Sequence, residues 1–200
     1  MAEGDRRERF RSLCREAARC RACQDVAHVH VLGPGNGRPD ALVMVVGEAP
    51  GRLGAARTGV PFTADATGRR FGRLLTAAGL RREELFLTNA LLCHPGDGRR
   101  NRRPRPQELR ACARWLRAQV EVVQPRLVVS LGEVALEALR LVSPHPYRLR
   151  QHVGQLLPWD GRWLVPLYHP SPRAENHRPW ERQLADFRRL GDLVKFLTHC

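Results

Sequence analysis

The feature that most constrains the fold is a regular alternation of short apolar runs with longer amphipathic stretches. The apolar runs predict strands at 41–46, 85–90, 126–131 and 163–168. Apolar side chains at helical spacing follow at 66–78, 107–123, 133–141 and 180–197. Apolar strands that alternate with helices form mostly parallel sheets covered on both faces. The alternation therefore predicts an α/β chain, a three-layer α/β/α architecture with a mostly parallel central sheet of about four strands.

Three loops directly follow predicted strands and are candidates for a functional site. They cover residues 47–51, 89–93 and 169–173. In sheets of this kind, ligands bind beyond the carboxyl ends of the strands. The glycine-rich segment at 33–37 is different, because it precedes a strand, whereas a phosphate-binding loop follows a strand and opens a helix. We interpret that segment as a turn.

The charge balance favours a polyanionic partner. The 200 residues include 34 Lys and Arg against 20 Asp and Glu, a formal net charge of +14. Lys195 is the only lysine. A GC-rich coding bias explains arginine in place of lysine, but not the excess of basic over acidic residues. This excess indicates nucleic acid, and Arg102 and Arg103 of an Arg/Pro-rich loop are candidates for phosphate contacts.

The sequence lacks the features of a membrane protein or of a protein with a secretory signal. No segment approaches the roughly 18–20 consecutive apolar residues of a membrane span. The first residues are charged where a secretory signal is apolar. We expect a cytoplasmic protein that is monomeric and has no membrane partner.

Six cysteines are present: Cys14, Cys20, Cys23, Cys93, Cys112 and Cys200. The cytoplasm disfavours disulfides, so clustered cysteines there indicate a metal. The Cys20-x-x-Cys23 pair is typical of a metal site, and a set of four thiolates would suit either zinc or an iron–sulfur cluster. The length of 200 residues and the hydrophobic content of 42% fit a single domain over residues 1–200. We expect the metal to tie the N-terminal segment 1–40 to the sheet.

Four motifs follow one another along the chain. They are Gly47-Glu48-Ala49-Pro50-Gly51, Thr58-Gly59-Val60-Pro61-Phe62, Leu87-Thr88-Asn89 and His169-Pro170-Ser171-Pro172. With the cysteines, they resemble the uracil-DNA glycosylase superfamily over roughly Cys20 to Leu190. The Glu48 motif is similar to family four, whereas Arg57-Thr58-Gly59 with Phe62-Thr63-Ala64-Asp65 is similar to family five, so both families stay open.

The resemblance implies a DNA repair enzyme whose partner is DNA containing uracil. Such an enzyme flips uracil out of DNA and hydrolyses its N-glycosidic bond, which leaves an abasic site. The resemblance also favours a [4Fe–4S] cluster, with zinc as the alternative. Its implied ligands are Cys20, Cys23, Cys93 and Cys112.

Catalytic and DNA-binding roles also come with the resemblance. Cleavage needs a donor at the departing base, negative charge near the sugar and an oriented water. His169 would donate a hydrogen bond to uracil O2. Glu48 would hold the water and stabilise the sugar cation, since Ala49 stands where related enzymes carry an aspartate. Ser171 and Arg173 would contact DNA, with Arg173 at the position of a leucine wedge.

The base pocket implied by the resemblance contains four residues. Phe62 would stack on the flipped base. Asn89 would read the N3–O4 edge, because an amide offers both a donor and an acceptor. Gly47 and Gly51 would complete the pocket, with Gly51 at the position where relatives carry a tyrosine that excludes thymine.

Other interpretations compete with this one. Taken alone, His169 fits a turn, Asn89 a cap, Phe62 the core and Glu48 a solvated loop. A metal-stabilised nucleic-acid-binding protein of the same fold without glycosylase activity would explain the charge and the cysteines, but not the motifs together. An iron–sulfur electron carrier is a third reading. Because Lys195 is the only lysine, we expect no Schiff-base lyase step and a monofunctional glycosylase.

Overall fold

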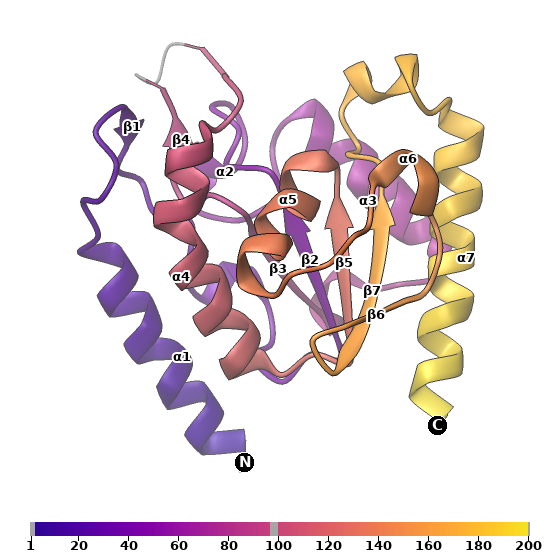
Figure 1. The fold of residues 1–200 in the computed structure, drawn as a ribbon, viewed down its shortest axis with the longest axis horizontal. Coiled ribbons are helices and arrows are strands. Elements are labelled where there is room, and N and C mark those ends of the chain that lie inside the picture. Colours follow the sequence, from indigo (N-terminus) through magenta and orange to yellow (C-terminus); the bar gives the residue numbers. More distant parts are fainter. Residues whose placement is uncertain (1–2, 97–99, 200) are drawn as a thin grey trace.

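The computed structural model describes residues 3–96 and 100–199, so Cys200 lies outside the described residues. Its centre is a sheet with strand order β3-β2-β5-β7-β6 (Figure 1). The strands are β2 (Val43–Gly47), β3 (Leu85–Asn89), β5 (Leu127–Leu131), β6 (Leu157–Trp159) and β7 (Arg162–Leu167). All neighbours pair in parallel except β6, which runs antiparallel to β7 at the edge. The predicted mostly parallel α/β sheet is confirmed, with β6 as a fifth strand.

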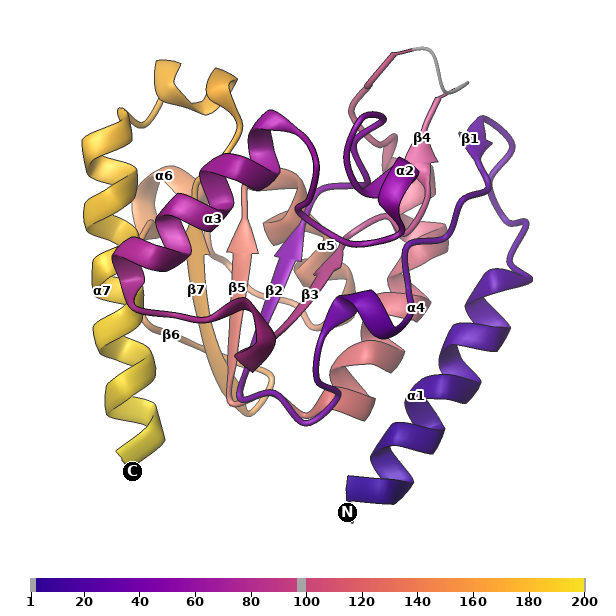
Figure 2. The same ribbon diagram turned by 180° about the vertical axis from the view of Figure 1, so that it is seen from behind.

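Helices cover both faces of this sheet. They are α1 (Glu3–Ala18), α4 (Pro106–Val123) and α5 (Glu133–Val142) on one face, and α3 (Ala66–Ala78) and α7 (Trp180–His199) on the other. Figure 1 shows α4 and α5 in front of the strands, and Figure 2 shows α3 and α7. Successive strand residues face opposite cores, so Val45 packs with α3 and α7 while Val46 packs with α4 and α5. This confirms the three predicted layers.

Helix α3 has the bounds that the sequence predicts, because both of its ends carry strong signals. The Asp65 carboxylate caps the first turn by accepting a 2.8 Å hydrogen bond from the Gly68 N–H. Gly79 ends the helix in the left-handed conformation, with φ of 66°. The cap brings the Asp65 side chain to the carboxyl edge of the sheet.

Helix α1 was not predicted. Phe10, Leu13 and Ala17 form its buried stripe against the core beside α4, and the Phe10 ring meets Phe86 edge-on at 5.4 Å. Charged residues fill most other positions and hide this stripe in the sequence. Apolar packing therefore holds this N-terminal helix against the core.

The glycine-rich segment at 33–37 is a turn, as predicted. It forms a 3₁₀ helix (Pro34–Asn36), and the buried Asn36 amide donates to the Leu87 carbonyl oxygen at 2.7 Å. The segment covers the outer edge of β3. The remaining short elements are β1 (Val26–Ala27), α2 (Ala55–Thr58), β4 (His94–Pro95), α6 (Leu149–His152) and the 3₁₀ helices at Arg82–Glu84 and Pro172–Asn176. No helix among the described residues is long and apolar enough to cross a membrane.

Candidate active site and metal centre

A cavity of about 470 Å³ opens at the carboxyl edge of the sheet, where β2, β3 and β7 end. The loops after these strands and the segment before α3 form its walls. The residues singled out in the sequence that line it are Glu48, Gly51, Phe62, Asn89, Arg102, His169, Ser171 and Arg173. Gly47 lies behind the ring of Phe62, and Arg103 lines a neighbouring groove. The structure therefore gathers nearly all of the predicted site residues in one place.

Gly47 allows two side chains to approach the end of β2. A Cβ at this position would lie 2.6 Å from Asn89 Oδ1 and 2.6 Å from Phe62 Cζ, so any side chain would displace both groups. Asn89 is 4% exposed. The Phe62 ring also packs on Phe71, with centroids 4.6 Å apart. An amide edge and a ring therefore meet at one end of the cavity.

The backbone that carries Phe62 is strained. Phe62 and Ala64 have φ of 53° and 63°, in the left-handed region that bulky residues avoid. The Arg82 guanidinium donates hydrogen bonds to the carbonyl oxygens of Pro61 and Phe62. A Cβ at Gly68 would lie 2.8 Å from the Phe62 carbonyl carbon. Long-range contacts therefore set the position of the ring.

Glu48 follows β2 and is half-buried in the cavity wall. Burial raises the pKa of its carboxyl group, because the ionised form loses hydration. The positive charge of Arg103 acts in the opposite direction. Glu48 can thus take up a proton at a higher pH than an ordinary glutamate.

His169 follows β7 and is neutral at pH 7. Burial lowers its pKa to about 4, while the negative charge of Asp65 acts in the opposite direction. Arg70 fixes the loop, since its Nε donates to the Pro170 carbonyl oxygen at 3.0 Å and its Nη1 pairs with Glu175 at 2.5 Å. The site therefore holds a neutral imidazole, which has one N–H to donate.

Asp65 is a cavity residue that the sequence analysis missed. Its Oδ1 caps α3, and its Oδ2 occupies space that a side chain at Gly51 or Gly54 would need. A Cβ at Gly51 or Gly54 would lie 2.8 Å or 2.3 Å from that oxygen. The position of Asp65 directly before a predicted helix is the typical signal of an N-cap, which hid its place in the cavity.

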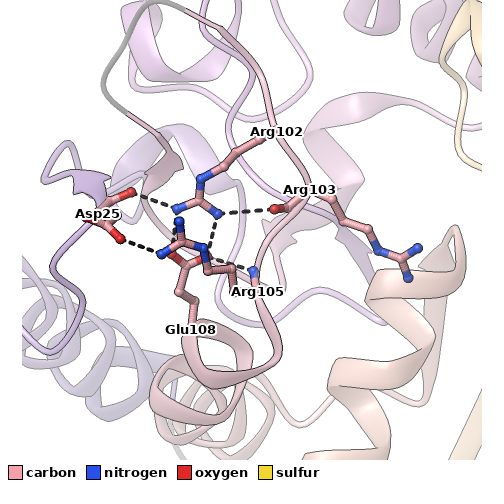
Figure 3. Close-up of polar contacts among 5 residues, drawn as sticks. All are labelled: Asp25, Arg102, Arg103, Arg105 and Glu108. Atoms are coloured by element: carbon pink, nitrogen blue, oxygen red, sulfur yellow. Dashed lines mark hydrogen bonds and ion pairs between the residues drawn. The ribbon is translucent and has the colours of Figure 1, made fainter.

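Arg102, a predicted phosphate contact, also makes several contacts within the protein. Its guanidinium pairs with the buried Glu108 at 2.6 and 2.9 Å and donates to the carbonyl oxygens of Asp25 at 2.7 Å and Arg103 at 3.1 Å (Figure 3). Arg105 also pairs with the Asp25 carboxylate. These contacts join the loop beside the cavity to the N-terminal segment.

The other two predicted DNA-contacting arginines are more open. Arg103 is exposed and makes a 3.4 Å ion pair with Glu137, which costs little to exchange for another anion. Arg173 is exposed at the start of a 3₁₀ helix on the cavity rim, and Ser171 precedes it half-buried. Both arginines can therefore reach a ligand outside the cavity.

A second, smaller hollow holds the predicted metal ligands. Cys20 and Cys23 come from the loop after α1, Cys93 follows β3, and Cys112 lies on α4. All four line the same small space. Cys14 is half-buried and does not line it among the described residues. The structure thus brings together the four cysteines that the sequence singled out.

The chemistry of these thiols fits a bound cation. Burial raises the pKa of Cys93 and of Cys112 to about 12 each, so neither is a thiolate at neutral pH without a positive partner. Two N–H donors face sulfur atoms, from Leu92 to Cys112 Sγ at 3.5 Å and from Arg114 to Cys20 Sγ at 3.4 Å. Donors of this kind stabilise metal-bound thiolates.

Two histidines also line the hollow. The ligand atoms of His28, His30 and Cys93 all lie within 4.8 Å of one another. His30 Nε2 lies 3.1 Å from the Cys20 carbonyl oxygen, which leaves Nδ1 of this ring available. The hollow therefore has the ligands of a Cys/His metal site, and all four cysteines line the same space.

Comparisons with known proteins agree with this arrangement. A family model described as the uracil DNA glycosylase superfamily matches residues 34–189. The chain is 30% identical over 191 residues to the type-4 uracil-DNA glycosylase of Archaeoglobus fulgidus, which covers 93% of this chain and 94% of the relative. It is 32% identical over 193 residues to the type-4 enzyme of Thermotoga maritima, with coverage of 95% and 97%. It is 40% identical over 156 residues to the type-5 enzyme of Thermus thermophilus, with coverage of 69% and 68%. The chain belongs to the uracil-DNA glycosylase superfamily.

Proposed function

We propose that this chain is a DNA repair glycosylase that flips uracil out of DNA and hydrolyses its N-glycosidic bond. The observation that carries the proposal is the single cavity that joins a ring, a buried amide, a neutral imidazole and two carboxylates. These groups are Phe62, Asn89, His169, Glu48 and Asp65. The relatives named type-4 and type-5 uracil-DNA glycosylases support the same activity.

The base is recognised by shape and by hydrogen bonds. Phe62 stacks on the flipped ring, and Asn89 accepts from N3–H and donates to O4. Gly47 keeps the ring and the amide close together. Because Gly51 has no side chain, Asp65 Oδ2 can lie at this part of the cavity wall, 2.8 Å from where a Cβ of residue 51 would stand. The pocket therefore excludes cytosine by polarity, since cytosine offers the opposite donor and acceptor at these two positions.

Bond cleavage places negative charge on the departing base. As the bond between the sugar C1′ and uracil N1 breaks, its electron pair stays on the base and charge grows on O2. His169 donates its N–H to O2. A neutral imidazole suits this role, because its pKa of about 4 keeps it a stable donor at neutral pH. The bond strengthens in the transition state, so it accelerates the reaction.

Water replaces the base at C1′. A water molecule held by Glu48 attacks C1′ and passes its proton to the Glu48 carboxylate. Asp65, anchored at the start of α3 where the helix dipole favours a negative charge, stabilises the cation-like sugar. The product is an abasic site in an intact strand.

The four cysteines hold a [4Fe–4S] cluster in this proposal, with zinc as the alternative. When bound, the metal centre supplies a crosslink between Cys20 and Cys23 of the N-terminal segment 1–40 and Cys93 and Cys112 of the sheet and α4, and so stabilises one domain over residues 1–200. The four thiols around one hollow, of which Cys93 and Cys112 are buried, and the N–H donors to Cys20 and Cys112 support this assignment.

The enzyme stops after excision and works as a monomer in the cytoplasm. Lys195 lies near the end of α7, 3.9 Å from Asp192, and is not among the described residues that line the cavity. A Schiff base with the abasic sugar is therefore not expected. Every group of the proposed mechanism comes from this chain, so no second copy is needed. A reducing cytoplasm keeps the thiols available for metal.

Base release from an oligonucleotide with one uracil tests the proposal. We expect free uracil and a strand that breaks only after alkali or heat. His169→Ala should lower single-turnover excision by about 10²–10³-fold and keep most DNA binding. A folded wild-type protein that binds DNA and releases no uracil is instead a metal-stabilised nucleic-acid-binding protein. Strand breaks without alkali that vanish in Lys195→Ala would contradict monofunctional chemistry.

A further inference from the structure

A second groove of about 960 Å³ continues from the cavity across the molecule. It runs between the start of α5 and the helix α6. The two hollows share Glu48, His169 and Arg173 as lining residues, so they are continuous. A DNA strand whose flipped nucleotide enters the cavity can therefore continue along this groove.

The arginines of the groove differ in what they bind. Arg140 is used within the protein, with Nε donating to His145 O at 3.1 Å and Nη2 to Tyr147 O at 2.8 Å. Arg148 and Arg150 line the groove and are exposed. Within residues 3–96 and 100–199, their guanidinium groups make no hydrogen bond or ion pair. Two cations thus lie on the wall without an internal partner.

The helix that carries these two arginines is held firmly. Leu149 between them is buried and anchors α6 in the core. The two bonds of Arg140 fix the segment before α6, and the Gly154 N–H donates to Pro166 O at 2.9 Å just after it. Arg148 and Arg150 are therefore displayed by a fixed support, which limits the entropy lost when they bind.

We propose that this groove binds the phosphate backbone of the DNA strand on one side of the flipped nucleotide, through Arg148 and Arg150. The proposal rests on the proposed function, because it takes the cavity as the place of the flipped base. Glu133 also lines the groove, but the arginines outnumber the acids there. A row of phosphates is the ligand that such a cationic wall favours. Arg173, at the junction with the cavity, contacts the phosphate next to the flipped nucleotide.

The test compares two double variants of equal charge. Arg148→Gln/Arg150→Gln removes the groove cations, and Arg188→Gln/Arg189→Gln removes two exposed arginines of α7, which covers the opposite face of the sheet (Figure 2). Affinity for a uracil duplex is measured by fluorescence anisotropy over a series of salt concentrations. Two lost phosphate contacts should weaken binding by up to about 60-fold at 0.1 M salt and flatten the log–log salt slope by about 1.8. The α7 variant should keep the wild-type slope.

A second pair of measurements fixes the place of the contact. The DNA is shortened on one side of uracil at a time. Shortening on the side that lies in the groove should abolish the loss of affinity caused by Arg148→Gln/Arg150→Gln, whereas shortening on the other side should leave this loss unchanged. Arg148→Lys/Arg150→Lys should restore the slope, which separates charge from folding. If the wild type excises uracil but the groove and α7 variants have equal salt slopes, the groove proposal is wrong and the glycosylase proposal stands. If the two variants differ in salt slope but the wild type releases no uracil, the groove binds DNA phosphates and the glycosylase proposal is wrong.

Discussion

The guanidinium of Arg82 donates a 3.2 Å hydrogen bond to the carbonyl oxygen of Phe62, 20 residues earlier in the chain. Phe62 has φ of 53°, a conformation that costs roughly 1–3 kcal/mol for such a residue. Its ring lies against Gly47 only while the backbone keeps this conformation. Arg82 is therefore a positioning residue for the stacking ring.

Arg82→Gln should lower uracil excision because the ring loses its fixed position. We expect a decrease of about 10- to 100-fold in the single-turnover rate at saturating DNA. Arg81→Gln is the matched control, since the neighbouring arginine is exposed and pairs with Glu84 instead. The fluorescence of 2-aminopurine beside uracil should show whether flipping is altered. Equal rates in the two variants would show that Phe62 is held without Arg82.

The acidic limb of the pH–rate profile should belong to Glu48. Excision needs the ionised carboxylate, so its rate should fall as the pH is lowered. Because burial raises the pKa of Glu48, this fall should occur at a pH above the ordinary glutamate pKa of about 4.3. His169 has a pKa of about 4 and stays neutral through that interval. Glu48→Gln should lower the rate at pH 7 by about 10²–10⁴-fold and remove the limb. A limb that survives this change and disappears in Asp65→Asn would assign the base to Asp65.

Much of the fold can be predicted from local patterns, and the exceptions have physical causes. The bounds of α3 follow from the cap at Asp65 and the left-handed Gly79. Helix α1 is hidden because its buried stripe is narrow and arginines surround it. Strand β6 has three residues with Pro158 at its centre, too few for an alternation to appear.

Site residues that directly follow a strand can be predicted from the sequence. Site features that depend on contacts between residues far apart in the sequence cannot. Glu48, Asn89 and His169 each follow a predicted strand and meet in the cavity. The bond from Arg70 to the Pro170 carbonyl spans 100 residues and leaves no local signal. The same holds for Arg102, whose hydrogen-bond partners include a backbone oxygen 77 residues away.

The pairing of Arg102 with Glu108 should make stability depend on pH. Burial alone would raise the pKa of Glu108, but the hydrogen bonds from Arg102 and the Arg105 N–H outweigh burial and lower it. The pair therefore stabilises the fold fully above the unfolded pKa of about 4.3, and this contribution is lost as the pH falls through the lower folded pKa.

Glu108→Gln should destabilise the protein by roughly 1–3 kcal/mol at pH 7, less than a fully buried pair because Arg102 is partly exposed. Urea unfolding at several pH values measures this difference, which should shrink below about pH 4. Glu121→Gln, an exposed change on the same helix, should have little effect at any pH. A Glu108→Gln deficit that stays constant down to pH 3 would show that the ion pair is not its source.

Metal content should depend on the four cysteines and not on the histidines. Anaerobically purified wild type should be brown and contain iron and acid-labile sulfide. Cys93→Ala should lose both and unfold at a lower temperature, whereas Cys14→Ala should keep them because Cys14 does not line the hollow among the described residues. His30→Ala should also keep iron. Stoichiometric zinc in the wild type that is lost in His30→Ala would instead indicate a single ion on His28, His30 and Cys93.

The discrimination between uracil and cytosine should reside in Asn89. Asn89 is 4% exposed and lies against Gly47, so its amide is largely shielded from solvent. Uracil presents an N3–H donor and an O4 acceptor, whereas cytosine presents an N3 acceptor and an amino donor. Cytosine therefore meets the amide with both polarities reversed, and each unpaired group costs roughly 1–3 kcal/mol.

Asn89→Asp should lose uracil excision and gain at least weak release of cytosine, because an ionised aspartate offers only acceptors to the amino group. Asn89→Ala is the matched control for the added charge and should lose uracil excision without gaining cytosine. Single-turnover assays on oligonucleotides that differ only in this base separate the two effects. Excision of uracil by Asn89→Ala at the wild-type rate would show that Asn89 does not read the base. Release of cytosine by both variants would assign the discrimination to the size of the pocket, because alanine enlarges the pocket but offers no acceptor.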